Sequence, residues 1–369
     1  MLQRVMIAGG GTGGHVYPGV AVAEEVLRRN PEAEVVFVGT ERGLESRILP
    51  KLGYRLETIT VSRLKGGGLW GRIKGLFRLP VGMFQSWRLL RKNKPQVVLG
   101  VGGYASGPAL LSAWLTRRAT AIQEQNATPG MTNRWLGKLV RAVFLGFAAG
   151  EAAFKKKKTV FTGNPIRAAL AARLAEAPEK SAADAPHALR VLVFGGSQGA
   201  RFLNERVPAT IAALVAAQPG LDVTVVHQTG PAEEEITRGR WSDLGLSERV
   251  TVVPFIDDMV SAYAAADLAV CRAGALTVAE LTAVGLPSLL VPFPFAADNH
   301  QEANAKVLAD AGAGHLVRQD GWDDAEVAGY LAALAADRPR LAQMSEASRA
   351  LARLDAARLI VDRLEGIAR

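Results

Sequence analysis

The segment Val191–Ala200, VLVFGGSQGA, joins a short run of large apolar side chains to a turn rich in glycine. This order is typical of a parallel β-strand that passes into a helix through a tight loop. A similar segment, VMIAGGGTGGH, covers Val5–His15 near the start of the chain. Two such junctions, separated by a long stretch of sequence, indicate two βαβ domains.

Further apolar runs along the chain support this fold. Many are continuous stretches of Val, Ile and Leu, as in strands buried on both faces of a parallel sheet. We expect strands at Arg4–Ala8, Glu34–Gly39, Gln96–Val101, Thr120–Gln123, Ala142–Leu145, Thr159–Thr162, Arg190–Phe194, Asp222–His227, Arg249–Val253, Leu268–Cys271, Ser288–Val291 and Gly314–Val317. The predicted fold class is α/β, with two Rossmann-like doubly wound parallel sheets.

The chain of 369 residues is long enough for two domains. We place the boundary after TGNPIR (Thr162–Arg167), with the first domain at 1–164 and the second at 165–349. The segment Ala175–Ala188, rich in Ala, Pro and charge, is interpreted as a linker or exposed loop. One final helix is expected at about Asp337–Ile367.

The net charge of +9 is concentrated in one segment. Arg63–Lys94 contains nine Lys or Arg and no Asp or Glu. Such a segment favours nucleic acid, anionic lipid or phosphorylated substrates as partners. The single cysteine, Cys271, excludes a disulfide framework and a cysteine-based zinc site. We expect neither a signal peptide nor a membrane-spanning helix.

Glycine turns follow expected strands at Gly9–Gly14, Gly100–Gly107 and Gly195–Gly199. Such turns let backbone N–H groups approach a phosphate at a helix N-terminus. Tight packing alone is the alternative explanation. Because neither the first nor the last turn is a clean G-x-G-x-x-G with a following ribose-binding acid, a dinucleotide dehydrogenase is disfavoured.

His15 follows Gly14 directly, in the first turn of a helix expected to begin near Pro18. A helix N-terminus disfavours the imidazolium ion, so the neutral, proton-accepting ring is favoured there. His15 is therefore a candidate general base. The alternative is a histidine that only caps the loop.

Two further side chains suit a nucleotide diphosphate. In CRAGALTVAEL (Cys271–Leu281), Glu280 is placed to accept hydrogen bonds from both hydroxyls of a ribose. Thr277 and Glu280 also have the spacing of a capping box, which is the alternative. Arg167, after GNP, is suited to a diphosphate, or it is a solvated surface residue. No cluster has metal-ligand spacing, so we expect a mechanism without a metal or other cofactor.

The segment Leu69–Lys92 interleaves large apolar side chains with Arg and Lys. Phe77, Val81, Phe84 and Trp87 fall at helical spacing, as in a basic amphipathic helix that binds a membrane surface. An ordinary helix that packs Phe and Trp into the core is the alternative. No nucleic-acid-binding motif accompanies the charge, so nucleic acid is not an expected partner.

Taken together, the motifs GGGTGGHVYPG, GVGGYASGP, EQNATPGMTNRWL, TGNPIR, FGGSQGA, PFID, CRAGALTVAE and NHQEANA extend from Gly9 to about Asn304. In this order they resemble the MurG family of bacterial N-acetylglucosamine transferases. The resemblance implies a GT-B fold, with two domains facing across a cleft. It also implies that residues 350–369 pack back on the first domain, which binds the acceptor and the membrane, while the second domain binds the UDP-sugar.

The family acts as an inverting transferase between UDP-N-acetylglucosamine and undecaprenyl-diphosphate-linked N-acetylmuramyl-pentapeptide. The resemblance assigns His15 as catalytic base, and Gly103, Tyr104 and Ser106 to the acceptor. It assigns to the donor Thr12, Gly13, Gly14, Asn126, Arg167, Ser197, Ile256, Ala275, Leu276, Thr277, Val278, Ala279, Glu280 and Gln301. The family's membrane patch corresponds to Phe77, Val81, Phe84, Trp87 and Trp114.

The resemblance further implies a peripheral location on the cytoplasmic face of the plasma membrane. Expected partners are the two substrates, anionic lipid, and proteins of cell-wall synthesis and division. A UDP-N-acetylglucosamine 2-epimerase shares the fold but needs no lipid, so the basic apolar segment disfavours it. A non-catalytic membrane-docking subunit is disfavoured because one chain carries both half-sites.

Overall fold

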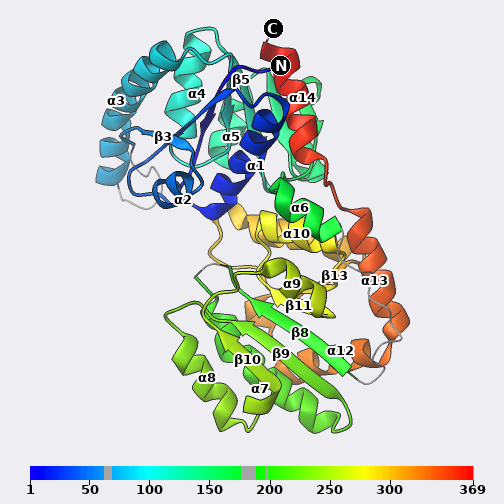
Figure 1. The fold of residues 1–369 in the computed structure, drawn as a ribbon. Coiled ribbons are helices and arrows are strands. Elements are labelled where there is room, and N and C mark those ends of the chain that lie inside the picture. The colour runs from blue at the N-terminus through cyan, green and yellow to red at the C-terminus, as the bar shows by residue number, and fades with distance from the viewer. Residues whose placement is uncertain (62–68, 176–187, 197, 369) are drawn as a thin grey trace. The chain divides into compact units, whose positions relative to one another are not determined.

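The structure, a computed structural model, describes residues 1–61, 69–175, 188–196 and 198–368, with side chains left out at 69–78 and 175. Two compact units divide it: Met1–Ala169 with Arg353–Arg369, and Leu170–Ala352. Each unit is built around one parallel sheet with helices on both faces (Figure 1). Most of the segment expected to be a linker lies outside the described residues.

The sheet of the first unit has the strand order β3-β2-β1-β4-β5-β6-β7, with every pairing parallel. Its strands are β1 (Arg4–Ala8), β2 (Glu34–Gly39), β3 (Arg55–Thr58), β4 (Val97–Gly100), β5 (Ala119–Glu124), β6 (Ala142–Leu145) and β7 (Thr159–Phe161). The accompanying helices are α1 (Gly13–Arg29), α2 (Glu45–Lys51), α3 (Leu69–Asn93), α4 (Ser106–Leu115), α5 (Met131–Leu136), η1 (Ala148–Ala153), η2 (Lys156–Lys158) and α14 (Ala356–Ala368).

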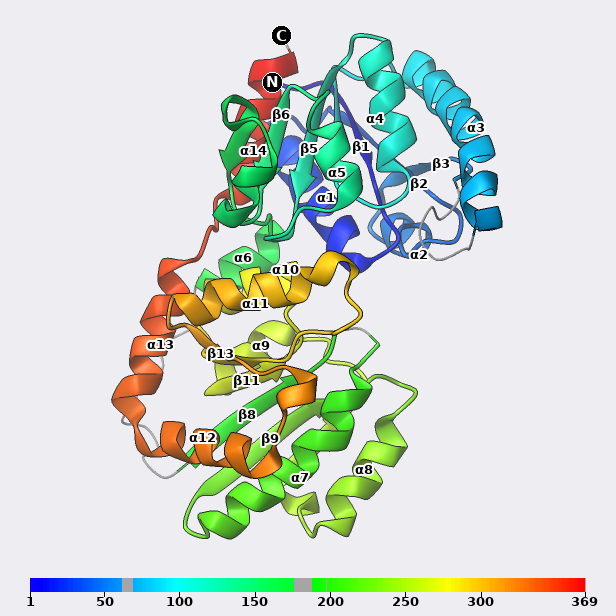
Figure 2. The same ribbon diagram turned by 180° about the vertical axis from the view of Figure 1, so that it is seen from behind.

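Alternation of side chains along these buried strands produces two cores in the first unit. On one face, Ile7, Leu99 and Phe144 pack with side chains from α1 and α14 (Figure 1). On the other, Met6 and Val98 pack with α4, α5 and the last turns of α3 (Figure 2). The C-terminal helix therefore completes the core of the first unit.

The second unit has the strand order β10-β9-β8-β11-β12-β13, again entirely parallel. Its strands are β8 (Ala188–Phe194), β9 (Asp222–Gln228), β10 (Val250–Val253), β11 (Leu268–Cys271), β12 (Ser288–Leu290) and β13 (Gly314–Leu316). Its helices are α7 (Arg201–Ala217), α8 (Glu234–Asp243), η3 (Ser247–Arg249), α9 (Met259–Ala265), α10 (Ala275–Val284), η4 (Ala297–Asn299), α11 (His300–Asp310), η5 (Gln319–Gly321), α12 (Asp324–Ala336) and α13 (Arg338–Ala350). The short helix α6 (Ala168–Ala175) begins where the first unit ends.

The predicted fold class is confirmed, and the expected strands are present, with some ends shifted by one or two residues. Strand β3 was not predicted, because RLET is a short, polar, half-exposed edge strand without an apolar run. The prediction of a single final helix was wrong, because α13 and α14 are separate helices that belong to different units. Helix α1 begins at Gly13, well before the expected start near Pro18.

Candidate functional site

In the first unit, two glycine turns leave the carboxyl ends of the neighbouring strands β1 and β4. Strand order reverses between these strands, and open α/β sheets bind ligands at such a point. The turns are in contact, since Gly10 N donates to Gly102 O at 3.3 Å. A Cβ on Gly103, which has φ +80°, would overlap the backbone of Gly10. The glycines at Gly10 and Gly103 thus permit this close approach.

His15 lies in the first turn of α1, whose N-cap is Thr12. Its Nδ1 lies 3.1 Å from the carbonyl oxygen of Gly10 and 3.3 Å from Oγ1 of Thr12. Because a carbonyl oxygen only accepts, we assign the ring hydrogen to Nδ1 and the lone pair to Nε2. Nε2 is then the nitrogen with the capacity to accept a proton. The structure places Gly13 and Gly14 beside it, in the same turn.

The turn after β4 carries the residues expected to meet the acceptor. Tyr104 is exposed, and Gly103 precedes it at positive φ. Ser106 is fully buried, and its Oγ lies 2.7 Å from Ala8 O and 2.8 Å from Gly102 O. Its hydroxyl therefore fixes the turn that carries Gly103 and Tyr104.

Asn126 follows β5 in a loop organised by Glu124. The Glu124 carboxylate accepts hydrogen bonds from Asn126 N at 2.9 Å, Gly130 N at 3.1 Å and Asn133 Nδ2 at 2.8 Å. Burial raises the pKa of Glu124, while these donors oppose that shift. Sequence reasoning missed Glu124, although an acid at the end of a buried strand is a signal for such a role.

Arg167 lies in the first unit, and its guanidinium is paired with a helix of that unit. Its Nε is 2.9 Å from Oε1 of Glu24 on α1, and Ala168 N donates to the other carboxylate oxygen at 3.0 Å. The side chain is partly exposed. The sequence did not indicate this pair, because its partners are far apart along the chain.

In the second unit, loops at the carboxyl ends of β8, β10, β11 and β12 carry the remaining candidates. The turn Gly195–Gly199 leads into α7, and Gly199, at φ +73°, lies against Thr229 and Gly230. Ser197 lies outside the described residues. Ile256 lies in the loop between β10 and α9. Asp258 fixes the end of this loop, because its carboxylate caps α9 and accepts two hydrogen bonds from Arg173.

Glu280 lies on α10, the helix after β11, and is partly buried. Its Oε2 accepts a hydrogen bond of 2.8 Å from the hydroxyl of Tyr263. Burial raises the pKa of Glu280 to about 7, against the opposing effect of this bond. The alternative prediction, a capping box formed by Thr277 and Glu280, was wrong. Helix α10 begins at Ala275, its N-cap is Gly274, and no side chain caps it. The residues Ala275, Leu276, Thr277, Val278 and Ala279 form the start of this helix.

Arg272 links the loops after β11 and β12, and Gln301 links the loop after β12 to α11. Arg272 is buried, and its guanidinium donates to Val291 O at 3.0 Å and Pro292 O at 3.1 Å. Burial lowers the pKa of Arg272 to about 10. Gln301 accepts a bond of 2.9 Å from Phe293 N. Arg272 was not predicted from the sequence, although an arginine directly after a buried strand was an available signal.

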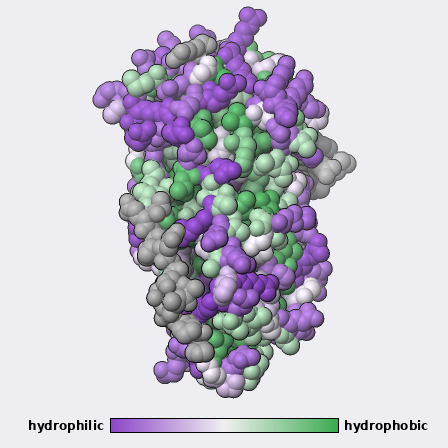
Figure 3. All heavy atoms as spheres, turned by 90° about the vertical axis from the view of Figure 1, so that its right-hand side faces the viewer, coloured by the Kyte–Doolittle hydropathy of each residue, from purple (hydrophilic) through white to green (hydrophobic). Residues whose placement is uncertain are grey.

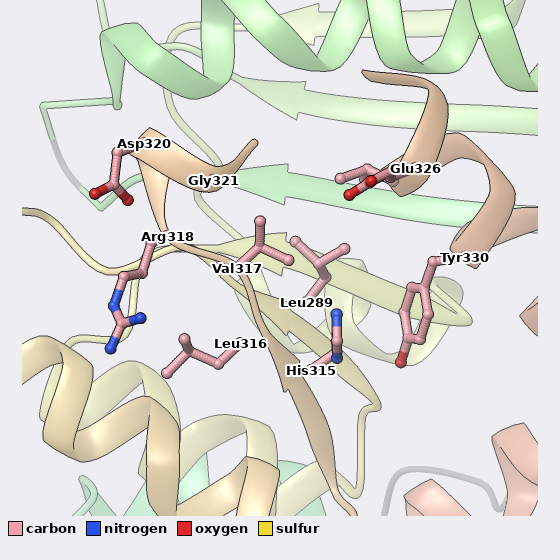
Figure 4. A pocket seen from close by; sticks show the side chains of 10 residues that line it. Leu289, His315, Leu316, Val317, Arg318, Asp320, Gly321, Glu326 and Tyr330 are labelled. Carbon is pink, nitrogen blue, oxygen red and sulfur yellow. The ribbon is translucent and has the colours of Figure 1, made fainter. Parts of the chain in front are cut away.

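A cavity of about 510 Å³ in the second unit adjoins these loops. Its lining includes Gly195, Gly199, Ala200, Arg201, Phe202, Glu205, Arg272, Phe293, Gln301 and Gln319. A different cavity, of about 460 Å³, lies beside the edge strand β13, where His315 stacks on Tyr330 (Figure 4). The lining of the cavity beside β13 includes none of the residues predicted for the site. The geometry therefore favours the cavity beside Gly195–Gly199.

The described part of α3 exposes Val81, Phe84 and Trp87, which we call the α3 surface. Their exposed fractions are 47%, 58% and 36%, and the rings of Phe84 and Trp87 stack at 5.7 Å. Arg91 lies over the Trp87 ring. Trp114, on the neighbouring helix α4, is also exposed. The Phe77 side chain lies outside the described residues.

Scattered apolar side chains are ordinary on a protein surface, as on the face drawn in Figure 3. Stacked aromatic rings beside arginine instead resemble an interaction surface. Within the described residues, no helix has the length and hydropathy needed to span a membrane. Nor do these residues contain a group of three His, Cys, Asp or Glu suited to a metal ion.

Comparison with known proteins agrees with this geometry. Residues 5–145 match the glycosyltransferase family 28 N-terminal domain, and residues 190–361 match its C-terminal domain. The chain is therefore a family 28 glycosyltransferase of the GT-B fold.

The chain is 47% identical over 361 residues to the UDP-N-acetylglucosamine--N-acetylmuramyl-(pentapeptide) pyrophosphoryl-undecaprenol N-acetylglucosamine transferase of Myxococcus xanthus, covering 98% of this chain and 92% of that protein. The crystal structure of Acinetobacter baumannii MurG aligns with a TM-score of 0.80 at 32% identity, covering 99% of both chains. Within family 28, the chain belongs to the MurG transferases. A UDP-N-acetylglucosamine 2-epimerase aligns at 0.64 with 16% identity over 99% of this chain and 96% of its own, which shows the fold alone.

Proposed function

We propose that this protein transfers N-acetylglucosamine from UDP-N-acetylglucosamine to the 4-hydroxyl of undecaprenyl-diphosphate-linked N-acetylmuramyl-pentapeptide, with inversion. The main support is that each unit carries a glycine turn at the carboxyl end of its central strand. Donor and acceptor both contain a diphosphate, which such turns bind. Membership of the MurG family supports the identity of both substrates.

In this mechanism, Nε2 of His15 accepts the proton of the acceptor's 4-hydroxyl. The hydroxyl oxygen forms a bond to the anomeric carbon as the bond from that carbon to the UDP oxygen breaks. The β-1,4 disaccharide and UDP are the products. Positive charge from Arg167 and the N–H groups of Gly195–Gly199 stabilises the leaving diphosphate.

Donor specificity is assigned to the second unit. The Glu280 carboxylate accepts hydrogen bonds from both ribose hydroxyls, and the backbone of Ile256 contacts the uracil edge. Ser197 belongs to the diphosphate turn, while the start of α10 and Gln301 meet the sugar hydroxyls. From the first unit, Thr12, Gly13, Gly14 and Asn126 contribute to donor binding, and Gly103 and Tyr104 to acceptor binding.

The acceptor's lipid tail requires the enzyme to work at a membrane surface. We assign this contact to the α3 surface, with Phe77 and Trp114, because stacked aromatic rings beside Arg88 and Arg91 suit anionic lipid. The protein then sits peripherally on the cytoplasmic face of the plasma membrane. Proteins of cell-wall synthesis and division are proposed as partners there, and nucleic acid is not.

The reaction is tested with the purified protein, UDP-N-acetylglucosamine and a short-chain muramyl-pentapeptide diphosphate lipid. Release of UDP only with the acceptor, together with a disaccharide product, is the expected result. Sugar epimerisation without acceptor would identify an epimerase. A folded, UDP-binding protein that turns over neither substrate would contradict the proposal and leave a docking function.

A further inference from the structure

Glu45 is the first residue of α2, and its carboxylate is buried beneath the first glycine turn. It accepts hydrogen bonds from Gly11 N at 2.6 Å, Thr40 N at 2.8 Å and Thr40 Oγ1 at 2.8 Å. The residue has no exposed surface. A carboxylate in such a position is costly unless several donors satisfy it, and here neutral donors do so.

The Gly11 N–H belongs to the same peptide unit as the carbonyl of Gly10. That carbonyl accepts a hydrogen bond from Nδ1 of His15 at 3.1 Å. One peptide unit is thus held at its N–H by Glu45 and at its oxygen by His15. A continuous chain of hydrogen bonds runs from the buried carboxylate to the imidazole ring.

The backbone around this chain is shaped to receive the carboxylate. A Cβ on Gly10, Gly39 or Gly43 would overlap the Glu45 side chain. Gly10 and Gly11 have φ values of +149° and +91°, which disfavour other residues. The orientation of the Gly10–Gly11 peptide therefore depends on glycine and on Glu45 together.

We propose that Glu45 is a positioning residue that holds His15 as the Nδ1–H tautomer through the Gly10–Gly11 peptide. The inference rests on the proposed function, in which Nε2 of His15 is the base. An anionic acceptor at the peptide N–H makes the carbonyl oxygen a stronger acceptor, because hydrogen bonds in a chain polarise one another. The carbonyl then fixes both the ring orientation and the nitrogen that carries the lone pair.

Glu45→Gln tests this inference with little change in shape. The glutamine retains the packing against Gly10, Gly39 and Gly43, but its NH₂ group must face at least one backbone N–H. We expect kcat to fall roughly 10- to 100-fold, as for misplacement of a reacting group, while KM for UDP-N-acetylglucosamine is retained. The ¹⁵N chemical shifts of the His15 ring should move from the Nδ1–H tautomer to a mixture of tautomers.

Glu25→Gln is the matched control. Glu25 lies on the same helix as His15 and accepts bonds from Arg28 and Arg29, so its loss perturbs α1 away from the glycine turn. We expect wild-type kcat and an unchanged His15 spectrum. The His15 signals are assigned by their absence from His15→Ala.

The double variant His15→Ala/Glu45→Gln separates positioning from stability. If Glu45 acts through His15, adding Glu45→Gln to His15→Ala leaves kcat unchanged. A further drop equal to that in the wild-type background would overturn the inference, as would a wild-type tautomer in Glu45→Gln. If His15→Ala alone keeps wild-type kcat, His15 is not the base. The ¹⁵N spectrum of the His15 ring in Glu45→Gln still shows whether Glu45 controls the tautomer.

Should Glu45→Gln fail to fold, Glu45→Asp provides the same comparison. It keeps the charge but withdraws the carboxylate from Gly11 N by one methylene. The tautomer shift and the loss of kcat are expected again, with Thr40→Ser, which keeps the hydroxyl donor to Glu45, as the control. Wild-type kcat and ring spectrum in Glu45→Asp would overturn the inference.

Discussion

The hydroxyl of Tyr263 donates a hydrogen bond of 2.8 Å to Oε2 of Glu280. Tyr263 is fully buried and Glu280 is partly buried, and burial raises the pKa of the tyrosine well above its ordinary value. Tyr263 therefore remains a donor throughout the physiological range, and Glu280 is the group that titrates. With the donor-binding role proposed for Glu280, this pair predicts that donor binding depends on pH.

We expect the affinity for UDP-N-acetylglucosamine to weaken about tenfold for each pH unit below the Glu280 pKa of about 7. In the proposed donor site, the ribose hydroxyls donate to the ionised carboxylate, so the ligand is expected to bind the deprotonated form and protonation to compete with it. Calorimetric titration between pH 5.5 and 8 measures the effect. The sugar nucleotide suits this test because its diphosphate does not titrate in this range.

Two variants check the assignment of this pH dependence. Glu280→Gln should bind about 10- to 100-fold more weakly at pH 8, as for loss of hydrogen bonds to a charged group, and should lose the dependence. Tyr263→Phe removes the bond that lowers the Glu280 pKa, so the midpoint should move to higher pH. The same pH profile in Glu280→Gln and wild type would refute the assignment.

The sequence was sufficient for features that depend on local pattern. Buried parallel strands such as Leu268–Cys271 have an uninterrupted apolar run, and the glycine turns follow them directly. Features that depend on distant partners were not predictable. Glu45 is 34 residues from Gly11, and Arg167 is 143 residues from Glu24, so neither contact leaves a local signal.

The same distinction explains the elements that differed. The edge strand β3 is half-exposed and so needs no apolar run. The break between α13 and α14 separates residues that pack in different units, and the helical pattern on either side conceals it. The acceptor role that the family resemblance assigns to Ser106 stays a prediction, and the contact of its hydroxyl with Ala8, 98 residues away in sequence, is a further feature without a local signal.

His15→Ala should lower kcat by roughly 10²–10⁴, the usual contribution of general base catalysis. Affinity for UDP-N-acetylglucosamine should stay close to that of the wild type, since the role proposed for the ring is on the acceptor's hydroxyl. Steady-state kinetics with the short-chain acceptor and calorimetric titration of the donor measure the two quantities. An unchanged kcat would remove His15 from the role of base.

The double variant Phe84→Asp/Trp87→Asp should reduce binding to vesicles of anionic lipid by at least about tenfold, because each exposed ring loses its burial in lipid. Vesicle co-sedimentation at low and high salt measures this loss and the electrostatic contribution of Arg88 and Arg91. Ile236→Asp/Leu244→Asp, which alters exposed apolar side chains of the second unit, is the control and should bind normally. Wild-type vesicle binding by the α3 variant would refute the membrane role.

His227 gives the second unit a stability that depends on pH. It is fully buried, with Nε2 3.1 Å from Asn204 Oδ1 and Nδ1 accepting from Trp241 Nε1 at 3.2 Å. Burial, assisted by the charge of Arg240, lowers its pKa from 6.5 to about 3. Between these values the unfolded chain binds the extra proton, so the free energy of unfolding falls as pH decreases.

The expected loss attributable to His227 is about 1.4 kcal/mol per pH unit below 6.5, measured by urea unfolding at pH 7, 6 and 5. His227→Gln replaces the ring with a group that accepts from Trp241, donates to Asn204 and does not titrate. Its free energy of unfolding should therefore depend less steeply on pH than that of the wild type. His300→Gln removes a histidine whose Nδ1 lies 2.6 Å from Ala297 O, outside the buried core around His227, and should retain the wild-type slope. Equal slopes in wild type and His227→Gln would show that His227 does not control the acid sensitivity of this unit.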